Sequence, residues 1–296
     1  MPTADPIDVY DPPRPAAPLR KPTYVVDAGK LLSSHPRELW NYRGLYTLLV
    51  KRDFVAVYKQ TVLGPLWFFF QPFLASLVYV VVFGQIARLS TSKLPPLVFY
   101  MSGIIVWNFF ANCLTQVSYT FLGSGGLFRK IYFPRLIIPL SQISMNLLNF
   151  LAQLLVLFIV IAVYRLHGTR IEISPMIFLV PLVLLAMSLL ALGLGCLIAS
   201  ATVKYRDLNI VVGYTLQLWM YSSLVIYPRE SVPARLQWLL TLNPMASLVE
   251  WYRASLFGTE RALLGPAIIG VLIILLMGIL GLWRFIKSEG TFTDSI

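Results

Sequence analysis

Charged residues are scarce in this chain: they make up 12% of its 296 residues, against 57% for hydrophobic residues. A soluble domain carries roughly 25% charged residues, so a water-soluble protein of this size would lack the polar side chains that cover its surface. The shortage excludes an ordinary soluble enzyme, a disordered chain and a fibrous protein. It also indicates that the net charge of +11 serves contact with anionic lipid, with no role for nucleic acid.

Six stretches lack Asp, Glu, Lys and Arg altogether: 60–87, 94–128, 136–164, 173–203, 208–228 and 262–283. Each has 21 to 35 residues, and about 20 apolar residues of helix cross a bilayer core. The sequence therefore predicts an all-α integral membrane protein with a transmembrane domain at 61–287. Its six spans are predicted at about 62–87, 97–120, 137–164, 175–202, 208–228 and 263–284.

Six spans place both chain ends on one side of the membrane. That side carries 16 Lys and Arg, and the opposite side carries 8. Because cytoplasmic loops are enriched in basic residues, both termini are predicted to be cytoplasmic. Residues 1–35 are predicted as a disordered, proline-rich tail, since seven of the 20 prolines fall within 1–22, and residues 288–296 as a second cytoplasmic tail.

Cysteine and histidine are almost absent, with two of each. Cys113 and Cys196 both fall inside predicted spans, so neither a disulfide framework nor a zinc site is supported. The pattern G-x-x-x-x-G-K-[ST] is also missing. The chain therefore does not bind ATP through a P-loop.

Carboxylates suited to catalysis are missing as well. A membrane enzyme acting on polyprenyl phosphates needs acidic residues near the bilayer to hold a metal or to serve as a base. The candidates near the inner face are Asp53 and Asp207, and the scattered outer ones are Glu172, Glu230, Glu250 and Glu260. We predict no catalytic residue, cofactor or metal in this chain, and such an enzyme remains the alternative of another class.

Residues 36–60 are predicted to form an amphipathic helix on the inner leaflet. One face of this helix collects Leu39, Tyr42, Tyr46, Leu49, Val50 and Val57. The opposite face carries most of the cations, which point toward lipid headgroups. Asp53 falls on the apolar face, where it either pairs with a neighbouring cation or meets a partner.

Polar residues recur at helical spacing inside two predicted spans. The second span carries Asn108, Asn112, Thr115 and Tyr119, and the third carries Gln142, Asn146, Asn149 and Gln153. Such stripes form hydrogen bonds between helices or line a polar pathway, and the sequence leaves both open. In the fourth span, Ala191, Gly195 and Ala199 predict a close packing face.

Two connecting segments have unusual compositions. The segment 122–135 combines glycines with basic and aromatic residues, which suits either lipid anchoring or the docking of a cytoplasmic partner. The outer segment 229–261 holds two short apolar stretches, Leu236–Leu242 and Met245–Phe257. We predict two short helices there that dip into the outer leaflet as re-entrant elements.

Four motifs occur in a fixed order along these segments: YKQTVLGPLW at 58–67, RKIYFPR at 129–135, KYRDL at 204–208 and LNPM at 242–245. With six spans and an amphipathic start, residues 36–290 resemble the membrane subunit of type 2 ABC exporters that move polysaccharide. The resemblance implies a homodimeric pore in the cytoplasmic (inner) membrane of a bacterium, with two ATPase subunits that hold ATP and Mg. The cargo it implies is a lipid-linked polysaccharide, such as O-antigen on a polyprenyl diphosphate carrier; capsule, teichoic acid, lipid or drug remain alternatives.

The resemblance also implies roles for particular residues. The segment 122–135 resembles a coupling helix, and its candidate contacts to the ATPase are Phe128, Arg129, Lys130, Tyr132, Phe133 and Arg135. At the inner gate, the cations available for a diphosphate headgroup are Arg37, Arg43, Lys51 and Arg52.

A sliding glycan needs walls of aromatic rings and neutral polar groups, because flat ring faces suit sugar C–H surfaces. The candidate wall residues are Trp67, Phe69, Phe70, Tyr79, Tyr100, Trp107, Asn108, Asn112, Trp219 and Tyr221. For each ring, a place in the lipid-facing belt or in the core is the alternative.

Overall fold

The computed structural model describes residues 40–59, 66–120, 133–202, 205, 207–258 and 264–294. The tail predicted over 1–35 and most of the segment 122–135 lie outside these ranges. The described part is helical and contains no strand. Its elements are α2 (Arg43–Lys59), α3 (Leu66–Tyr79), η2 (Val80–Ile86), α4 (Pro96–Ser118), α6 (Ile137–Leu166), η3 (Pro175–Leu179), α7 (Val180–Thr202), α8 (Leu208–Tyr221), η4 (Arg229–Ser231), η5 (Ala234–Leu236), α9 (Gln237–Leu242), α10 (Pro244–Phe257) and α11 (Leu264–Asp294).

Five helical segments among the described residues are long and apolar enough to cross a membrane. They are Phe69–Ile86, Pro96–Ser118, Ile137–Leu166, Pro175–Thr202 and Leu264–Lys287. These segments coincide with five of the six charge-free stretches, because helix is the way an apolar segment satisfies its own backbone groups. The first segment continues α3 through η2, a wider π-helical turn.

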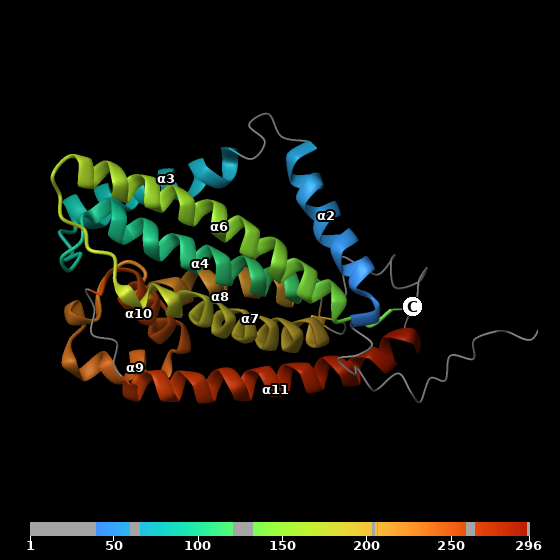
Figure 1. The fold of residues 1–296 in the computed structure, drawn as a ribbon. Helices are drawn as coiled ribbons and strands as arrows, with labels where there is room; N and C mark the ends of the chain where they lie inside the picture. Colours follow the sequence, from blue (N-terminus) through green and yellow to red (C-terminus); the bar gives the residue numbers. More distant parts are fainter. Residues whose placement is uncertain are drawn as a thin grey trace, which may run out of the picture. The chain divides into compact units, whose positions relative to one another are not determined.

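Helix α4 lies at the centre of the helical packing. In the most apolar 18 residues of its span, 78% of the residues are buried, against 11% in Phe69–Ile86 and 17% in the corresponding 18 residues of Leu264–Lys287. It packs against α3, α6, α7, α8 and α10, and Figure 1 shows it between α6 and α7. The core is therefore built around one apolar helix, and the peripheral helices leave much of their surface to lipid or to other subunits.

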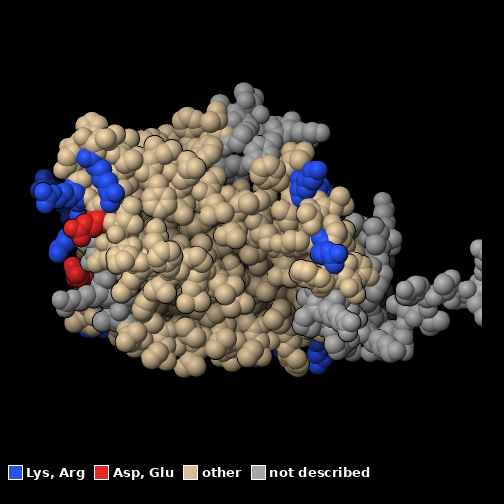
Figure 2. Space-filling view, in the orientation of Figure 1, with Lys and Arg blue, Asp and Glu red and all other residues tan. Residues whose placement is uncertain are grey.

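The two ends of the long helices differ in composition. Helix α2 and the C-terminal end of α11 lie at one end, called here the α2 end, whereas α9 and α10 lie at the other, the α10 end (Figure 1). Figure 2 shows the charged side chains of this face gathered at the two ends, with an uncharged band between them. This arrangement fits a bilayer core around the middle of the helices.

The residues predicted as the span 208–228 do not form one continuous helix. Helix α8 covers only Leu208–Tyr221, which at about 1.5 Å per residue is shorter than a bilayer core. The hydroxyls of Ser222 and Ser223 donate to the Trp219 carbonyl over 3.0 and 2.7 Å. Leu224 then takes a left-handed conformation, with φ of 57°, and turns the chain away.

Helix α11 differs from its predicted range in the other direction. Its span was predicted to end near residue 284, but the helix continues to Asp294. Most of the segment predicted as a C-terminal tail is therefore the last turns of α11. Its sequence SEGTFTD contains no proline that would end the helix earlier.

Small residues let α7 approach two neighbours closely. Ala191 and Ala199 are buried, and a Cβ on Gly195 would lie 2.6 Å from Val117 Cγ1 of α4. The packing face predicted from these three residues is thus present within one protomer. The sequence did not reveal the second approach, in which a Cβ on Gly281 of α11 would lie 2.0 Å from the Gly193 carbonyl oxygen.

We expect Gly281→Ala to lower the free energy of unfolding by about 1–3 kcal/mol, because the added methyl group forces the two backbones apart. Gly278→Ala, one turn away in the same helix, has open space around its added Cβ and should be neutral or slightly stabilising. Thermal unfolding of both variants in detergent measures the difference. Equal melting temperatures would contradict the close approach.

Candidate functional site

The uncovered side of α4 is polar. Asn108 and Thr115 are half-buried, Asn112 and Gln116 are exposed, and Tyr119 keeps 43% of its surface accessible. These residues recur every three or four positions and so share one face of the helix. A helix that is otherwise buried in apolar packing thus presents most of these polar side chains on a side that the described helices leave partly accessible.

Helices α3 and α8 flank this uncovered side at the α10 end. The Tyr79 hydroxyl of α3 donates to the Met220 sulfur of α8 over 3.7 Å. The Trp107 and Trp219 rings of α4 and α8 meet edge to face, with centroids 6.4 Å apart. The three helices therefore form a continuous surface that carries most of the predicted pathway residues.

The predicted pathway residues differ in their exposure. Trp67, Phe70, Asn112 and Tyr221 are exposed, and Phe69, Tyr79, Asn108 and Trp219 are half-buried. Tyr100 and Trp107 are buried in the protomer's own core. Tyr100 packs edge to face on Tyr79 and Phe99, so it supports the half-buried ring of Tyr79 from behind.

The polar stripe of α6 mainly joins helices. Asn146 is buried, and its Nδ2 donates to Gln116 Oε1 of α4 over 2.8 Å and to the Gln142 carbonyl over 2.9 Å. Thr120 donates to Gln142 Oε1 over 3.4 Å. Of the two interpretations of this stripe, interhelical hydrogen bonding is therefore confirmed for Asn146 and Gln142. On α4, Gln116 takes part in this contact, whereas Asn108, Asn112 and Tyr119 stay at least partly accessible.

Helix α2 packs on the beginning of α6 through its apolar face. Leu49 is buried against Phe133 and Ile137, and the Tyr46 hydroxyl hydrogen-bonds the Ser144 hydroxyl. The predicted apolar face is confirmed for Tyr42, Tyr46 and Leu49, which an amphipathic helix turns toward its packing partner.

The predicted gate cations of α2 point outward. Arg43, Lys51 and Arg52 are exposed, and Arg37 lies outside the described residues. Asp53 accepts a hydrogen bond from Arg52 Nε over 2.8 Å, so its neighbouring cation is its partner. The cationic face is therefore available for headgroups or for another subunit.

Of the predicted coupling residues, Phe128, Arg129, Lys130 and Tyr132 lie outside the described residues. Phe133 is buried in the contact between α2 and α6, and Arg135 is half-buried. The Phe133 ring therefore attaches the end of this segment to the protomer itself.

Asn243 organises the α10 end around α8 and α10. Its Oδ1 accepts hydrogen bonds from the Met245 and Ala246 amides, which caps α10 with Pro244 in the first turn. The same oxygen accepts from Trp219 Nε1 over 2.9 Å, and its Nδ2 donates to the Ser222 carbonyl over 2.8 Å. A cavity of about 480 Å³ opens beside Trp219 and Asn243, lined mainly by leucines of η5 and α9.

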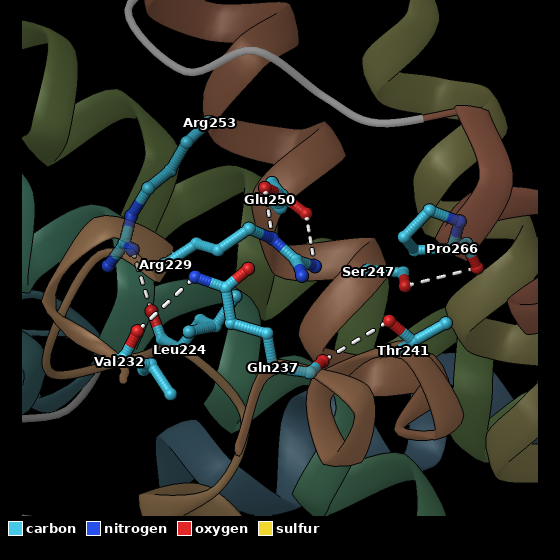
Figure 3. A network of polar contacts seen from close by, with 9 residues as sticks. All are labelled: Leu224, Arg229, Val232, Gln237, Thr241, Ser247, Glu250, Arg253 and Pro266. Atoms are coloured by element: carbon cyan, nitrogen blue, oxygen red, sulfur yellow. Dashed lines mark hydrogen bonds and ion pairs between the residues drawn. The ribbon is translucent and has the colours of Figure 1, made fainter. Parts of the chain in front are cut away.

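Two charged residues of α10 are buried three positions apart. Glu250 is 3% exposed and Arg253 is 0% exposed. Glu250 accepts two hydrogen bonds from Arg229, over 2.7 and 2.8 Å. Arg253 donates to the carbonyls of Leu224 and Val225, each over 2.7 Å. Figure 3 shows Arg229 bound to Glu250 and Arg253 bound to Leu224.

Sequence reasoning missed this network, since Glu250 was grouped with scattered outer acids and Arg253 only counted as an outer cation. A usable signal was present: two opposite charges on one face of the otherwise apolar run Met245–Phe257. Between them, Tyr252 is fully buried, and burial raises the pKa of its phenol above the usual range while Arg253 opposes that shift. Within the described ranges, no three of His, Cys, Asp and Glu gather to hold a metal ion.

These features define a helical membrane domain whose most central helix presents a polar, uncovered face. The ABC-2 type transporter family matches residues 44–257, and the chain belongs to this family. It is accordingly a membrane permease subunit of an ABC transporter, a transport subunit without an ATPase domain.

Named relatives are similar over most of the chain. The O-antigen export system permease protein RfbA of Myxococcus xanthus is 32% identical over 220 residues, 74% of this chain and 82% of the relative. RfbA of Klebsiella pneumoniae is 28% identical over 217 residues, 72% of this chain and 82% of the relative. The capsule polysaccharide export inner-membrane protein CtrC of Neisseria meningitidis serogroup A is 25% identical over 243 residues, 81% of this chain and 90% of the relative.

We expect Asn243→Ala to lower the free energy of unfolding by about 1–2 kcal/mol, because it removes a helix cap together with the partner of Trp219. Asn243→Asp keeps the accepting oxygen and loses the donor to Ser222 and Ser223, so its loss of stability should be smaller. Thermal unfolding followed by tryptophan fluorescence measures both. If the two variants unfold at the same temperature, the cap contributes nothing.

Proposed function

We propose that this chain is the channel-forming permease of an ATP-driven exporter that moves lipid-linked polysaccharide across the bacterial inner membrane. The observation that carries the proposal is the similarity to O-antigen and capsule export permeases over 72–81% of the chain. O-antigen on a polyprenyl diphosphate carrier is the proposed cargo, since the percentage identity of this chain to the O-antigen permeases, 28% and 32%, is higher than the 25% to the capsule protein.

The pathway we propose runs along the uncovered side of α4 between two copies of the chain. Amides facing lipid are unfavourable because hydrocarbon offers them no hydrogen-bond partner. A second copy placed opposite would enclose Asn108, Asn112 and Tyr119 in a shared channel, where water and sugar hydroxyls can satisfy them. The exposed surface of α3 and η2 supports this assembly, since it leaves a large area for a partner helix.

Aromatic rings complete the proposed wall. Trp67 and Phe70 at the beginning of α3, and Tyr221 at the end of α8, are exposed, and Tyr79 and Trp219 are half-buried near the α10 end. Flat rings contact the C–H faces of sugars without fixing one register, so a long glycan can slide. Tyr100 and Trp107 act behind this wall by packing against Tyr79 and Trp219.

In the membrane, the α10 end is proposed to face outward and the α2 end the cytoplasm. Helix α8 with the segment that follows it then makes the sixth crossing, and both termini are cytoplasmic. Helices α9 and α10 become re-entrant elements of the outer leaflet. The exposed apolar side chains of Leu236, Trp238, Leu239 and Leu242 support this placement, since lipid would cover them.

The energy for transport is proposed to come from ATP hydrolysis by partner subunits. Two ATPase subunits, which hold ATP and Mg, are proposed to dock on the cytoplasmic segment 122–135 through Phe128, Arg129, Lys130, Tyr132 and Arg135, with Phe133 attaching the segment to α2. The exposed Arg43, Lys51 and Arg52 of α2, with Arg37 before them in the sequence, are proposed to bind the diphosphate headgroup through charge-assisted hydrogen bonds.

If the α4 stripe lines the channel, Asn112→Leu reduces glycan export several-fold while leaving membrane insertion unchanged, because it removes a polar contact from the wall. The control is Leu275→Ala on the exposed apolar face of α11, which should leave export unaffected. Export is measured as surface glycan in cells that depend on the variant. Unchanged export by Asn112→Leu would place the stripe outside the channel.

If the segment 122–135 couples the permease to its ATPase, Arg129→Glu abolishes co-purification of an ATPase subunit and export fails. Lys93→Glu changes an exposed cation at the opposite end of the molecule and should leave co-purification intact. Affinity purification from membranes, followed by an ATPase assay, distinguishes the two. An ATPase that still accompanies Arg129→Glu would refute this docking site.

A further inference from the structure

The end of α8 is an unusual place for a helix to stop. Its charge-free run continues through residue 228, yet the helix ends at Tyr221. Leu224 then adopts a left-handed conformation, which is unfavourable for a residue other than glycine. The carbonyls freed by this break lie in an apolar setting where each unsatisfied group is costly, so other groups must satisfy them.

Arg253 supplies the missing donors. Its Nη1 donates to the Leu224 carbonyl and its Nη2 to the Val225 carbonyl, each over 2.7 Å. The Phe99 carbonyl of α4 accepts from Nη2 over 3.3 Å, and the guanidinium lies 3.8 Å from the centroid of the Phe99 ring. Only the planar, five-donor group of arginine can bind carbonyls of two elements and stack on a ring at once.

The packing of α4 is fitted to this guanidinium. A Cβ on Gly103 would lie 2.5 Å from Arg253 Nη2 and 2.7 Å from the Val225 carbonyl oxygen. Gly103 therefore leaves the space in which the arginine and the unwound chain meet α4. One turn earlier on α10, Glu250 holds Arg229 by two hydrogen bonds, so the segment 224–229 is tied to α10 at both of its ends.

We infer that Arg253 is a positioning residue for transport: it keeps residues 222–228 unwound and thereby holds Trp219 and Tyr221 at the α10 end of the pathway. The role of Arg253 in transport rests on the proposed function, whereas its effect on the conformation of residues 222–228 does not. Without the guanidinium, residues 222–228 recover their hydrogen bonds by winding onto α8, since a charge-free run of 21 residues is long enough to span as one helix.

The experiment measures the state of this segment directly, by electron paramagnetic resonance between spin labels at the exposed positions Leu218 and Glu230. A continuous helix separates these positions by about 18 Å. We expect Arg253→Met and Gly103→Ala to shift the distance toward that value. Arg253→Lys keeps a charged donor group on a single nitrogen and should give a mixture of the two distances. Gly84→Ala is the control, because its added Cβ meets only ordinary contacts of 3.7 Å or more.

Export should fall in parallel with the shift in Arg253→Met and Gly103→Ala, because Trp219 and Tyr221 then leave their places at the α10 end of the pathway. An unchanged distance in whichever of the variants folds overturns the inference. Failure of all three to fold also overturns it, since Arg253 would then serve folding alone. The distance needs no cargo, so a protein that shifts as expected but exports no glycan would instead refute the proposed function.

Discussion

Every backbone break inside an apolar domain needs its own hydrogen-bond partners, and this requirement shapes the α10 end of the molecule. Continuous helices satisfy themselves, but the chain interrupts its helices at Ser222–Pro228 and again at Asn243. At the first break the partners are two serine hydroxyls and the Arg253 guanidinium. At the second break, the Asn243 side chain caps α10 and binds α8. Polar side chains are few in this domain, and several of them form hydrogen bonds at these two interruptions.

The same need for hydrogen-bond partners explains why charged side chains are buried here. An ionised group inside a protein is unfavourable unless hydrogen bonds satisfy it, and both Glu250 and Arg253 have several such bonds. They are placed on a short helix that packs against α4, α7 and α11. Three further contacts hold this region together: Ser247 to the Pro266 carbonyl, Gln237 to the Val232 carbonyl and Thr241 to the Gln237 carbonyl (Figure 3).

Much of the fold could be predicted from where charges are missing, because a long uncharged segment in a membrane forms a helix to satisfy its backbone hydrogen bonds. Five long helices, the apolar face of α2 and the small-residue face of α7 followed from spacing alone. The break after Tyr221 did not, because hydropathy measures side chains, and the break depends on donors that lie 28 and 29 residues away in sequence. Burial of Tyr100 and Trp107 was likewise beyond reach, since an aromatic residue has the same hydropathy in a wall and in a core.

The contact between Gly193 and Gly281 has a mechanical consequence. Where two backbones touch, no flexible side chain lies between them that could change rotamer and absorb a displacement. Helices α7 and α11 therefore behave as one stiff body, and α4 is joined to it through Gly195 and Val117. Among the described helices, α2, α3 and α8 lie outside this stiff body, and α2 contacts the others mainly through the beginning of α6. Helix movements during transport are therefore expected in these outer helices.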